Sequence, residues 1–178
     1  MSRFFKEYAY YFITVPTLRH ERLFDSNEKK ELLVQRIKKG VLKYDITELY
    51  FGINSDHYHL IGYFKNKESI PGLLNFINGG SSYNLNNLDN KRGRMIWDEY
   101  YLYLVEDDDA LYKIKGYVIG NPYKHGEVKT LDHLKYYKFS SYAEVVDKEG
   151  EEMAKGMILS CIDLKLDEIK KGMKLIYY

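Results

Sequence analysis

The chain of 178 residues has a single cysteine, Cys161, which excludes an internal disulfide and favours a reducing compartment such as the cytoplasm. It lacks any apolar run long enough to span a membrane, so no membrane-spanning helix is expected. Residues 1–7 turn polar before an apolar segment develops, and we therefore expect no signal peptide. There is no internal repeat and no low-complexity tract. These absences leave a cytoplasmic globular protein whose length suits one domain with a terminal extension.

An excess of charge of either sign is also missing, because 27 Lys and Arg stand against 26 Asp and Glu, for a net charge of +1. The total charge therefore gives no indication of nucleic-acid binding. Residues 1–43 are locally basic, with 10 Lys or Arg against 5 Asp or Glu. Such a segment suits a phosphate backbone and equally suits a solvated helix face. Tryptophan is scarce, whereas the 19 tyrosines suit both a sheet core and surfaces that stack bases.

Hydrophobic periodicity and capping residues predict the secondary structure. Strands are expected at residues 8–15, 47–53, 57–64 and 94–105. Helices are expected over 28–43, from Ser69 to about Ile77, from Asp107 to about Gly120, and within the last thirty residues. Pro122 is expected to end the third of these helices. A loop rich in Gly, Asn and Ser is expected at 79–93, and irregular structure at 131–143.

The order strand–helix–strand–strand–helix–strand predicts an α+β fold of the ferredoxin-like split βαβ type. Its antiparallel sheet should have the two long helices on one face, which leaves the other face available for a site. We expect a domain over residues 1–145 and a C-terminal helical extension over residues 146–178.

Two histidines follow a predicted tight turn, in the run His57-Tyr58-His59. Side chains alternate along a strand, so both imidazoles point to one face and Tyr58 points to the other. Neighbouring imidazoles on a rigid strand are candidate metal ligands. Taken alone the pattern is weak, because a chain with five histidines can show it by chance.

Tyr117 and Asn121 lie four residues apart on a predicted helix and therefore share one face. The amide oxygen of Asn121 is a candidate third ligand, and a phenol one turn earlier would lie beside such a metal, where it could attack a phosphodiester. The alternative is a buried tyrosine followed by an asparagine that caps the helix.

Together these motifs resemble the REP-associated tyrosine transposases, a branch of the single-tyrosine HUH endonucleases. The family's His-hydrophobic-His is similar to His57-Tyr58-His59, and its Tyr-Ile-x-x-Asn-Pro is similar to Tyr117-Val118-Ile119-Gly120-Asn121-Pro122. Its Trp-Ser-Ser-Tyr resembles Phe-Ser-Ser-Tyr at 139–142, and its Gly-x-hydrophobic-Trp resembles Arg-Met-Ile-Trp at 94–97. Over residues 8–145 the order and spacing agree, so residues 1–145 are expected to form the catalytic domain.

One departure lies before the first histidine, where the family usually has Met-Pro-Asn and this chain has Asn54-Ser55-Asp56. We interpret Asp56 as a turn residue, with an influence on a bound metal as the alternative.

The resemblance implies that His57, His59 and Asn121 bind one Mg²⁺ or Mn²⁺ ion, which polarises a phosphate of single-stranded DNA that contains hairpins. It implies that Tyr117 attacks this phosphate, forms a 5′-phosphotyrosine link and frees a 3′-hydroxyl, so that strands are rejoined without ATP. The asparagine four residues on favours Tyr117 over the other candidate nucleophiles, Tyr100, Tyr101, Tyr103 and Tyr112.

Phosphate contacts are expected from four basic side chains, Arg19, Lys91, Arg92 and Arg94. A homodimer remains open, and so does whether Tyr117 acts in its own subunit or in a partner's. Two other functions remain open: a hairpin-binding module that does not cleave, and a hydrolytic phosphodiesterase that uses the same metal without a covalent intermediate.

Overall fold

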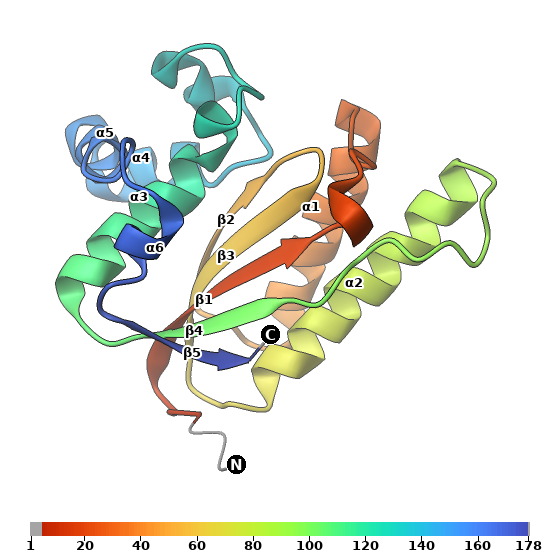
Figure 1. Cartoon of the computed structure of the whole chain (residues 1–178), viewed down its shortest axis with the longest axis horizontal. Helices are drawn as coiled ribbons and strands as arrows, with labels where there is room; N and C mark the ends of the chain where they lie inside the picture. The colour runs from red at the N-terminus through yellow and green to blue at the C-terminus, as the bar shows by residue number, and fades with distance from the viewer. Residues whose placement is uncertain (1–4, 178) are drawn as a thin grey trace.

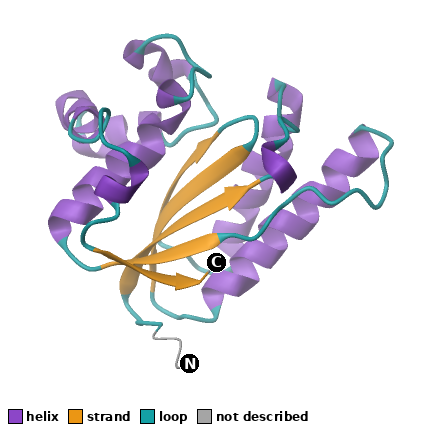
Figure 2. Cartoon of the chain, viewed as in Figure 1, coloured by secondary structure: helices purple, strands orange, loops and turns teal. Residues whose placement is uncertain are grey.

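A computed structural model describes residues 5–177, in which five antiparallel strands form one sheet with helices against both faces (Figure 1). Residues 1–4, which belong to the segment that argues against a signal peptide, lie outside the described residues, as does residue 178. The strands are β1 (Ala9–Pro16), β2 (Glu48–Ile53), β3 (His57–Phe64), β4 (Tyr101–Val105) and β5 (Met173–Tyr177). Their order across the sheet is β2-β3-β1-β4-β5 (Figure 2).

The helices account for most of the remaining chain. They are α1 (Asn27–Lys43), α2 (Ser69–Leu88), α3 (Asp108–Lys124), α4 (Tyr142–Glu149), α5 (Glu151–Leu159) and α6 (Leu166–Ile169), with short 3-10 turns η1 (Leu18–His20) and η2 (Leu131–Tyr136). No helix within residues 5–177 is both long and apolar enough to cross a membrane.

Helices α1 and α2 pack against one face of the sheet, as predicted (Figure 1). Ser26 begins α1 by accepting a hydrogen bond from the Lys29 amide, which satisfies one of the free N–H groups of the first turn. Leu33 and Ile37 of α1 are buried against the sheet, where Leu60 of β3 is inaccessible to solvent. The α+β fold with an antiparallel sheet is therefore confirmed.

The other face of the sheet is covered as well, by a helix that the prediction did not place there. Helix α3 lies against β2 and β3 on this side, and α5 packs against α3 (Figure 1). The reason is that α3 is buried without interruption from Ile114 to Pro122, so it needs neighbours on more than one side. Gly116 provides the close approach, since a Cβ there would lie 2.1 Å from the Met157 carbonyl oxygen of α5.

Two element boundaries differ from the sequence prediction. Helix α2 continues to Leu88 through the segment expected as a loop, because Ile77, Ser81 and Leu85 recur at helical spacing and are all buried. Tertiary packing thus outweighs the low helix propensity of Gly, Asn and Ser. The segment 94–100, which was predicted as the first part of the fourth strand, does not form a strand in the structure. It makes only an isolated bridge between Trp97 and Thr17.

Helix α3 also continues past Pro122 to Lys124, so the proline does not end the helix as predicted. The proline removes one backbone hydrogen bond, but only two residues of α3 follow it, and the His125 amide still bonds to the Asn121 carbonyl at 3.0 Å. The C-terminal extension contains the helices that were predicted, but its last residues form strand β5, which pairs with β4 at the edge of the sheet.

Candidate active site between the sheet and helix α3

The β2–β3 hairpin places both histidines on the face of the sheet that α3 covers. His57 and His59 pair across the sheet with Pro16 and Thr14 of β1. Tyr58 points to the opposite face, where its hydroxyl donates to the Asn78 Oδ1 at 2.6 Å beneath α2. The predicted alternation along the strand therefore holds.

Helix α3 lies close to the sheet because β2 has a glycine, Gly52, at the point of contact. A Cβ on Gly52, which pairs with His59, would lie 2.1 Å from the Val118 carbonyl oxygen. The segment 139–142 adds two bonds to the same arrangement. The Ser140 hydroxyl donates to the Ile119 carbonyl at 2.7 Å, and the Phe51 amide donates to the Ser141 hydroxyl at 2.9 Å. The Phe-Ser-Ser-Tyr segment is thus hydrogen-bonded both to the edge strand β2 and to α3.

The two sequence motifs meet at this contact. The Tyr117 ring lies 5.2 Å from the His59 ring, centroid to centroid, and the Asn121 Oδ1 lies 3.0 Å from the His57 Nε2. The His57 and His59 rings are 4.9 Å apart. All four side chains come from one chain, so the candidate nucleophile lies beside the candidate metal ligands of its own subunit.

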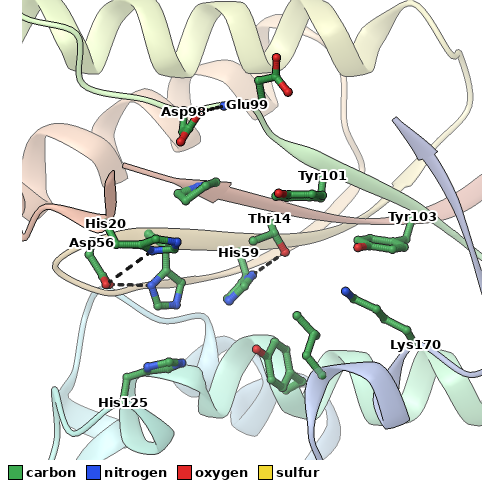
Figure 3. Close-up of a pocket in the computed structure, with 14 residues that line it drawn as sticks. Thr14, His20, Asp56, His59, Asp98, Glu99, Tyr101, Tyr103, His125 and Lys170 are labelled. Carbon is green, nitrogen blue, oxygen red and sulfur yellow. Dashed lines mark hydrogen bonds and ion pairs between the residues drawn. The ribbon is translucent and has the colours of Figure 1, made fainter. Parts of the chain in front are cut away.

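Each histidine is oriented through its Nδ1. The His57 Nδ1 lies 2.7 Å from the Asp56 Oδ1, and the His59 Nδ1 lies 3.0 Å from the Thr14 hydroxyl (Figure 3). An ionised carboxylate only accepts, so His57 donates from Nδ1 and its Nε2 keeps a lone pair in the neutral ring. The His57 bond also holds the pKa of the Asp56 carboxyl below its usual range. Asp56 therefore does more than form a turn, because carboxylates in this position commonly orient metal-binding imidazoles.

His125 is a site residue that the sequence reasoning missed. Its ring lies 4.7 Å from the His57 ring. Burial and the neighbouring His57 lower its pKa. The signal was present in the sequence, because Tyr117, Asn121 and His125 follow one another at intervals of four and so continue one helix face.

These side chains line a pocket of about 530 Å³ (Figure 3). The two β3 histidines, Tyr117 and His125 form one side, and β4 contributes tyrosines to the other. The C-terminal extension contributes Lys170, whose ammonium group lies 4.8 Å from the centre of the Tyr103 ring. Asn121 is fully buried and does not line the pocket itself; its amide lies behind the His57 imidazole.

The reactive groups are more buried than an open sheet face would leave them, since His57 is 8% exposed, His59 2% and Tyr117 7%. Burial lowers the pKa of His59 well below its ordinary value, and the nearby His57 and His125 act in the same direction. Burial also raises the pKa of the Tyr117 phenol, with the Asn121 side chain opposing. The site thus favours a neutral His59 imidazole, the form that binds metals, and a Tyr117 phenol that a nearby cation would help to ionise.

Among residues 5–177 there is no cluster of three or more His, Cys, Asp or Glu side chains suited to a metal ion. A cation at this site would therefore depend on amide oxygen in addition to the two imidazoles. The 3.0 Å between the His57 Nε2 and the Asn121 Oδ1 fits such a role. Adjacent ligands of an octahedral shell with bonds of roughly 2.1 Å are about 3.0 Å apart.

The basic residues predicted to contact phosphate lie outside the pocket. Arg19 is exposed in η1, and Lys91 and Arg92 are exposed in the loop after α2. Arg94 is engaged within the fold, because it pairs with Asp89 at 2.6 Å and also donates to the Asn86 side chain. The locally basic residues 1–43 include α1, which packs on the opposite face of the sheet. His20 of η1 does line the pocket, at 3.9 Å from the Asp56 carboxylate.

The chain is similar to known proteins in sequence and in fold. The family model described as "Transposase IS200 like" matches residues 4–121. No curated protein matches the chain. Among solved structures, a REP-associated tyrosine transposase bound to a REP hairpin matches with a TM-score of 0.65 and 16% identity, over 86% of this chain and 88% of that one. A candidate transposase from Deinococcus radiodurans matches with a TM-score of 0.45 and 14% identity, over 66% and 93%. Because the family match spans more than half of its length, the chain belongs to the IS200-like transposases.

Proposed function

We propose that this protein cleaves and rejoins single-stranded DNA that contains hairpins, through a covalent 5′-phosphotyrosine link at Tyr117. The observation that carries the proposal is the convergence of Tyr117 with His57 and His59 at one pocket of a single chain, with the Asn121 Oδ1 3.0 Å from the His57 Nε2. A phenol beside two imidazoles and an amide oxygen is an arrangement suited to metal-assisted attack on a phosphodiester.

In the proposed step the Tyr117 phenolic oxygen forms a bond to phosphorus and the bond from phosphorus to the 3′-oxygen breaks. The phenol loses a proton and the departing 3′-oxygen gains one, so the exchange is balanced and the phosphoester energy is conserved. His57, His59 and Asn121 would hold an Mg²⁺ or Mn²⁺ ion, which would polarise the phosphate and favour the phenolate. The reverse attack by another 3′-hydroxyl rejoins the strand.

The pocket walls support a single-stranded substrate. Tyr101 of β4 is 42% exposed and lines the pocket, where a base can stack on its ring. Lys170 brings a cation to the same wall. The choice of hairpin DNA draws on the solved relative, which is bound to a REP hairpin.

The test is incubation of the purified protein with labelled hairpin-containing single strands and Mn²⁺, followed by a denaturing gel. The wild type should nick the DNA and give a covalent protein–DNA band. Tyr117→Phe keeps the ring and removes the hydroxyl, so it should bind DNA but give neither product. Tyr112→Phe is the matched control, because Tyr112 lies on the same helix and does not line the pocket.

The remaining outcomes separate the other functions. An adduct that persists in Tyr117→Phe would identify another nucleophile, and Tyr101, which lines the pocket, would be tested next. Metal-dependent cleavage without any adduct would establish a hydrolytic phosphodiesterase. Tight hairpin binding without cleavage in any metal would leave a binding module that has lost catalysis.

A further inference from the structure

Asn54, which directly follows β2, lies against the proposed metal site, although it was predicted only as a turn residue. Its Nδ2 atom is 2.9 Å from the His57 Nε2 and 2.5 Å from the Asn121 Oδ1. The residue is 1% exposed. Its side chain therefore closes a triangle with the two groups already assigned to the metal.

The turn does not need this side chain. Asparagine in a turn usually bonds to nearby backbone, whereas the contacts of the Asn54 amide are with His57 and Asn121. The hairpin is held by Ser55 instead, whose backbone amide and hydroxyl both donate to the Glu127 carboxylate, at 2.9 and 2.7 Å. Glu127 is paired in turn with the buried Lys30 of α1.

Two amide atoms in this cluster are buried without a hydrogen-bond partner, the Asn54 Oδ1 and the Asn121 Nδ2. Buried polar atoms without partners are costly, so neither amide is fully satisfied by the hydrogen bonds within this cluster. The oxygen and nitrogen of an amide have nearly the same shape, so a half-turn of the Asn54 amide exchanges them. That half-turn would bring its oxygen within 3 Å of two further lone pairs, on the His57 Nε2 and the Asn121 Oδ1. Three lone pairs this close repel one another unless a cation lies between them.

We propose that the Asn54 amide oxygen is a further ligand of the divalent cation, beside Asn121 and the two imidazoles. The inference rests on the proposed function, since it concerns the same metal. It supplies a second amide oxygen at a site where, among residues 5–177, no group of three His, Cys, Asp or Glu side chains is suited to hold a metal ion. A ligand set with two oxygens also suits Mg²⁺ and Mn²⁺ better than imidazoles alone.

The competing role for Asn54 is that of a hydrogen-bond donor, which would hold the Asn121 oxygen in place through its NH₂ group. The two roles make opposite predictions for Asn54→Asp. An aspartate keeps an oxygen and adds negative charge, so a ligand role predicts Mn²⁺ binding that is as tight as in the wild type or tighter. A donor role predicts weaker binding, because the new carboxylate would repel the Asn121 oxygen.

The experiment measures Mn²⁺ dissociation constants in the absence of DNA, by titration calorimetry and by the electron paramagnetic resonance signal of free Mn²⁺. We expect Asn54→Ala to weaken binding about tenfold or more, which is typical for loss of a group around a metal. Asn54→Asp should bind at least as tightly as the wild type. Asn86→Ala is the control, because Asn86 of α2 is also buried but bonds to Arg94, on the opposite face of the sheet from the site.

Equal weakening in Asn54→Ala and Asn54→Asp would overturn the ligand role, and so would wild-type affinity in Asn54→Ala. If Asn54→Ala does not fold, Asn54→Asp alone still decides, because the two roles predict opposite changes. His57→Ala separates this inference from the proposed function. Loss of Mn²⁺ binding in His57→Ala together with wild-type affinity in Asn54→Ala would contradict only the ligand role of Asn54. If the wild type does not bind Mn²⁺, the proposed metal site itself is contradicted.

Discussion

The two histidines of the site differ in what surrounds them. His59 is 2% exposed and packs on the Phe12 ring at 5.5 Å and on the Tyr117 ring at 5.2 Å. His57 lies nearer the surface, beside Asp56 and His125. Replacing His59 should therefore affect both metal binding and packing, whereas replacing His57 should affect mainly metal binding.

His57→Ala should abolish cleavage with little change in stability, whereas His59→Ala should abolish cleavage and also destabilise the fold by about 1–3 kcal/mol. Cleavage is measured on the hairpin substrate in Mn²⁺ and stability by urea unfolding in EDTA. Asn121→Ala should lower cleavage less than either change, because water can replace a neutral amide ligand. Cleavage by His57→Ala at the wild-type rate would contradict the metal mechanism.

The depressed pKa of His59 makes stability depend on pH. Its pKa in the fold lies well below its ordinary value of about 6.5, so below that pH the unfolded chain takes up a proton that the folded chain does not. The free energy of unfolding should therefore fall as the pH falls from 7 towards 5, in metal-free protein. His59→Gln should flatten this dependence. The measurement is urea unfolding at both pH values, and an equal slope in the two proteins would show that His59 is not the cause.

At the scale of elements, the sequence predicted most of the sheet because β1, β2 and β3 carry clear strand patterns. It also predicted that Tyr117 and Asn121 share a helix face, since helical spacing is a local property. It could not predict that α3 covers the face left open, because that depends on two long-range contacts. These are the approach of α3 to Gly52 of β2 and its approach to α5 at Gly116, and neither leaves a periodic pattern.

Gly52→Ala tests the first of these contacts. The added Cβ would meet the Val118 carbonyl oxygen at 2.1 Å, so α3 must shift away from the sheet and take Tyr117 and Asn121 with it. We expect a loss of about 2–4 kcal/mol in unfolding free energy and a strong reduction of the covalent adduct.

The matched control is Gly79→Ala in α2, where an added Cβ meets nothing within 4 Å. Alanine favours a helix over glycine, so this variant should be as stable as the wild type or up to about 1 kcal/mol more stable. Wild-type adduct formation by Gly52→Ala would show that the close contact of α3 with β2 is not needed for the site.

At the scale of the whole molecule, the C-terminal residues belong to the site as well as to the fold. Strand β5 extends the sheet, α5 supports the helix that carries Tyr117, and Lys170 enters the pocket wall. A nucleotide in the pocket would therefore meet Lys170 of the C-terminal extension. Net charge of +1 gives no general attraction for DNA, so binding must depend on a few local cations.

Two sets of cations compete for that role, Lys170 in the pocket wall and the pair Lys91 and Arg92 in the loop after α2. The chain runs from that loop through Trp97 to Asp98 and Glu99, which line the pocket. A DNA strand that leaves the pocket along this segment would therefore reach Lys91 and Arg92. Each phosphate contact contributes about −0.7 to the slope of log affinity against log salt for a single strand. Lys170→Ala should flatten the slope by about 0.7, and the double change Lys91→Ala with Arg92→Ala by up to about 1.4.

Affinities are measured with hairpin single strands at several salt concentrations, in the Tyr117→Phe background and in EDTA, so that cleavage cannot interfere. Lys67→Ala is the control, because Lys67 is an exposed lysine in the turn between β3 and α2 and does not line the pocket. Its slope should equal that of the parent. A slope changed only by Lys170→Ala would confine the DNA to the pocket, and a slope changed only by the double substitution would place the main path along the α2 loop. If neither changes the slope, the phosphates are held by other groups and both sets of contacts are wrong.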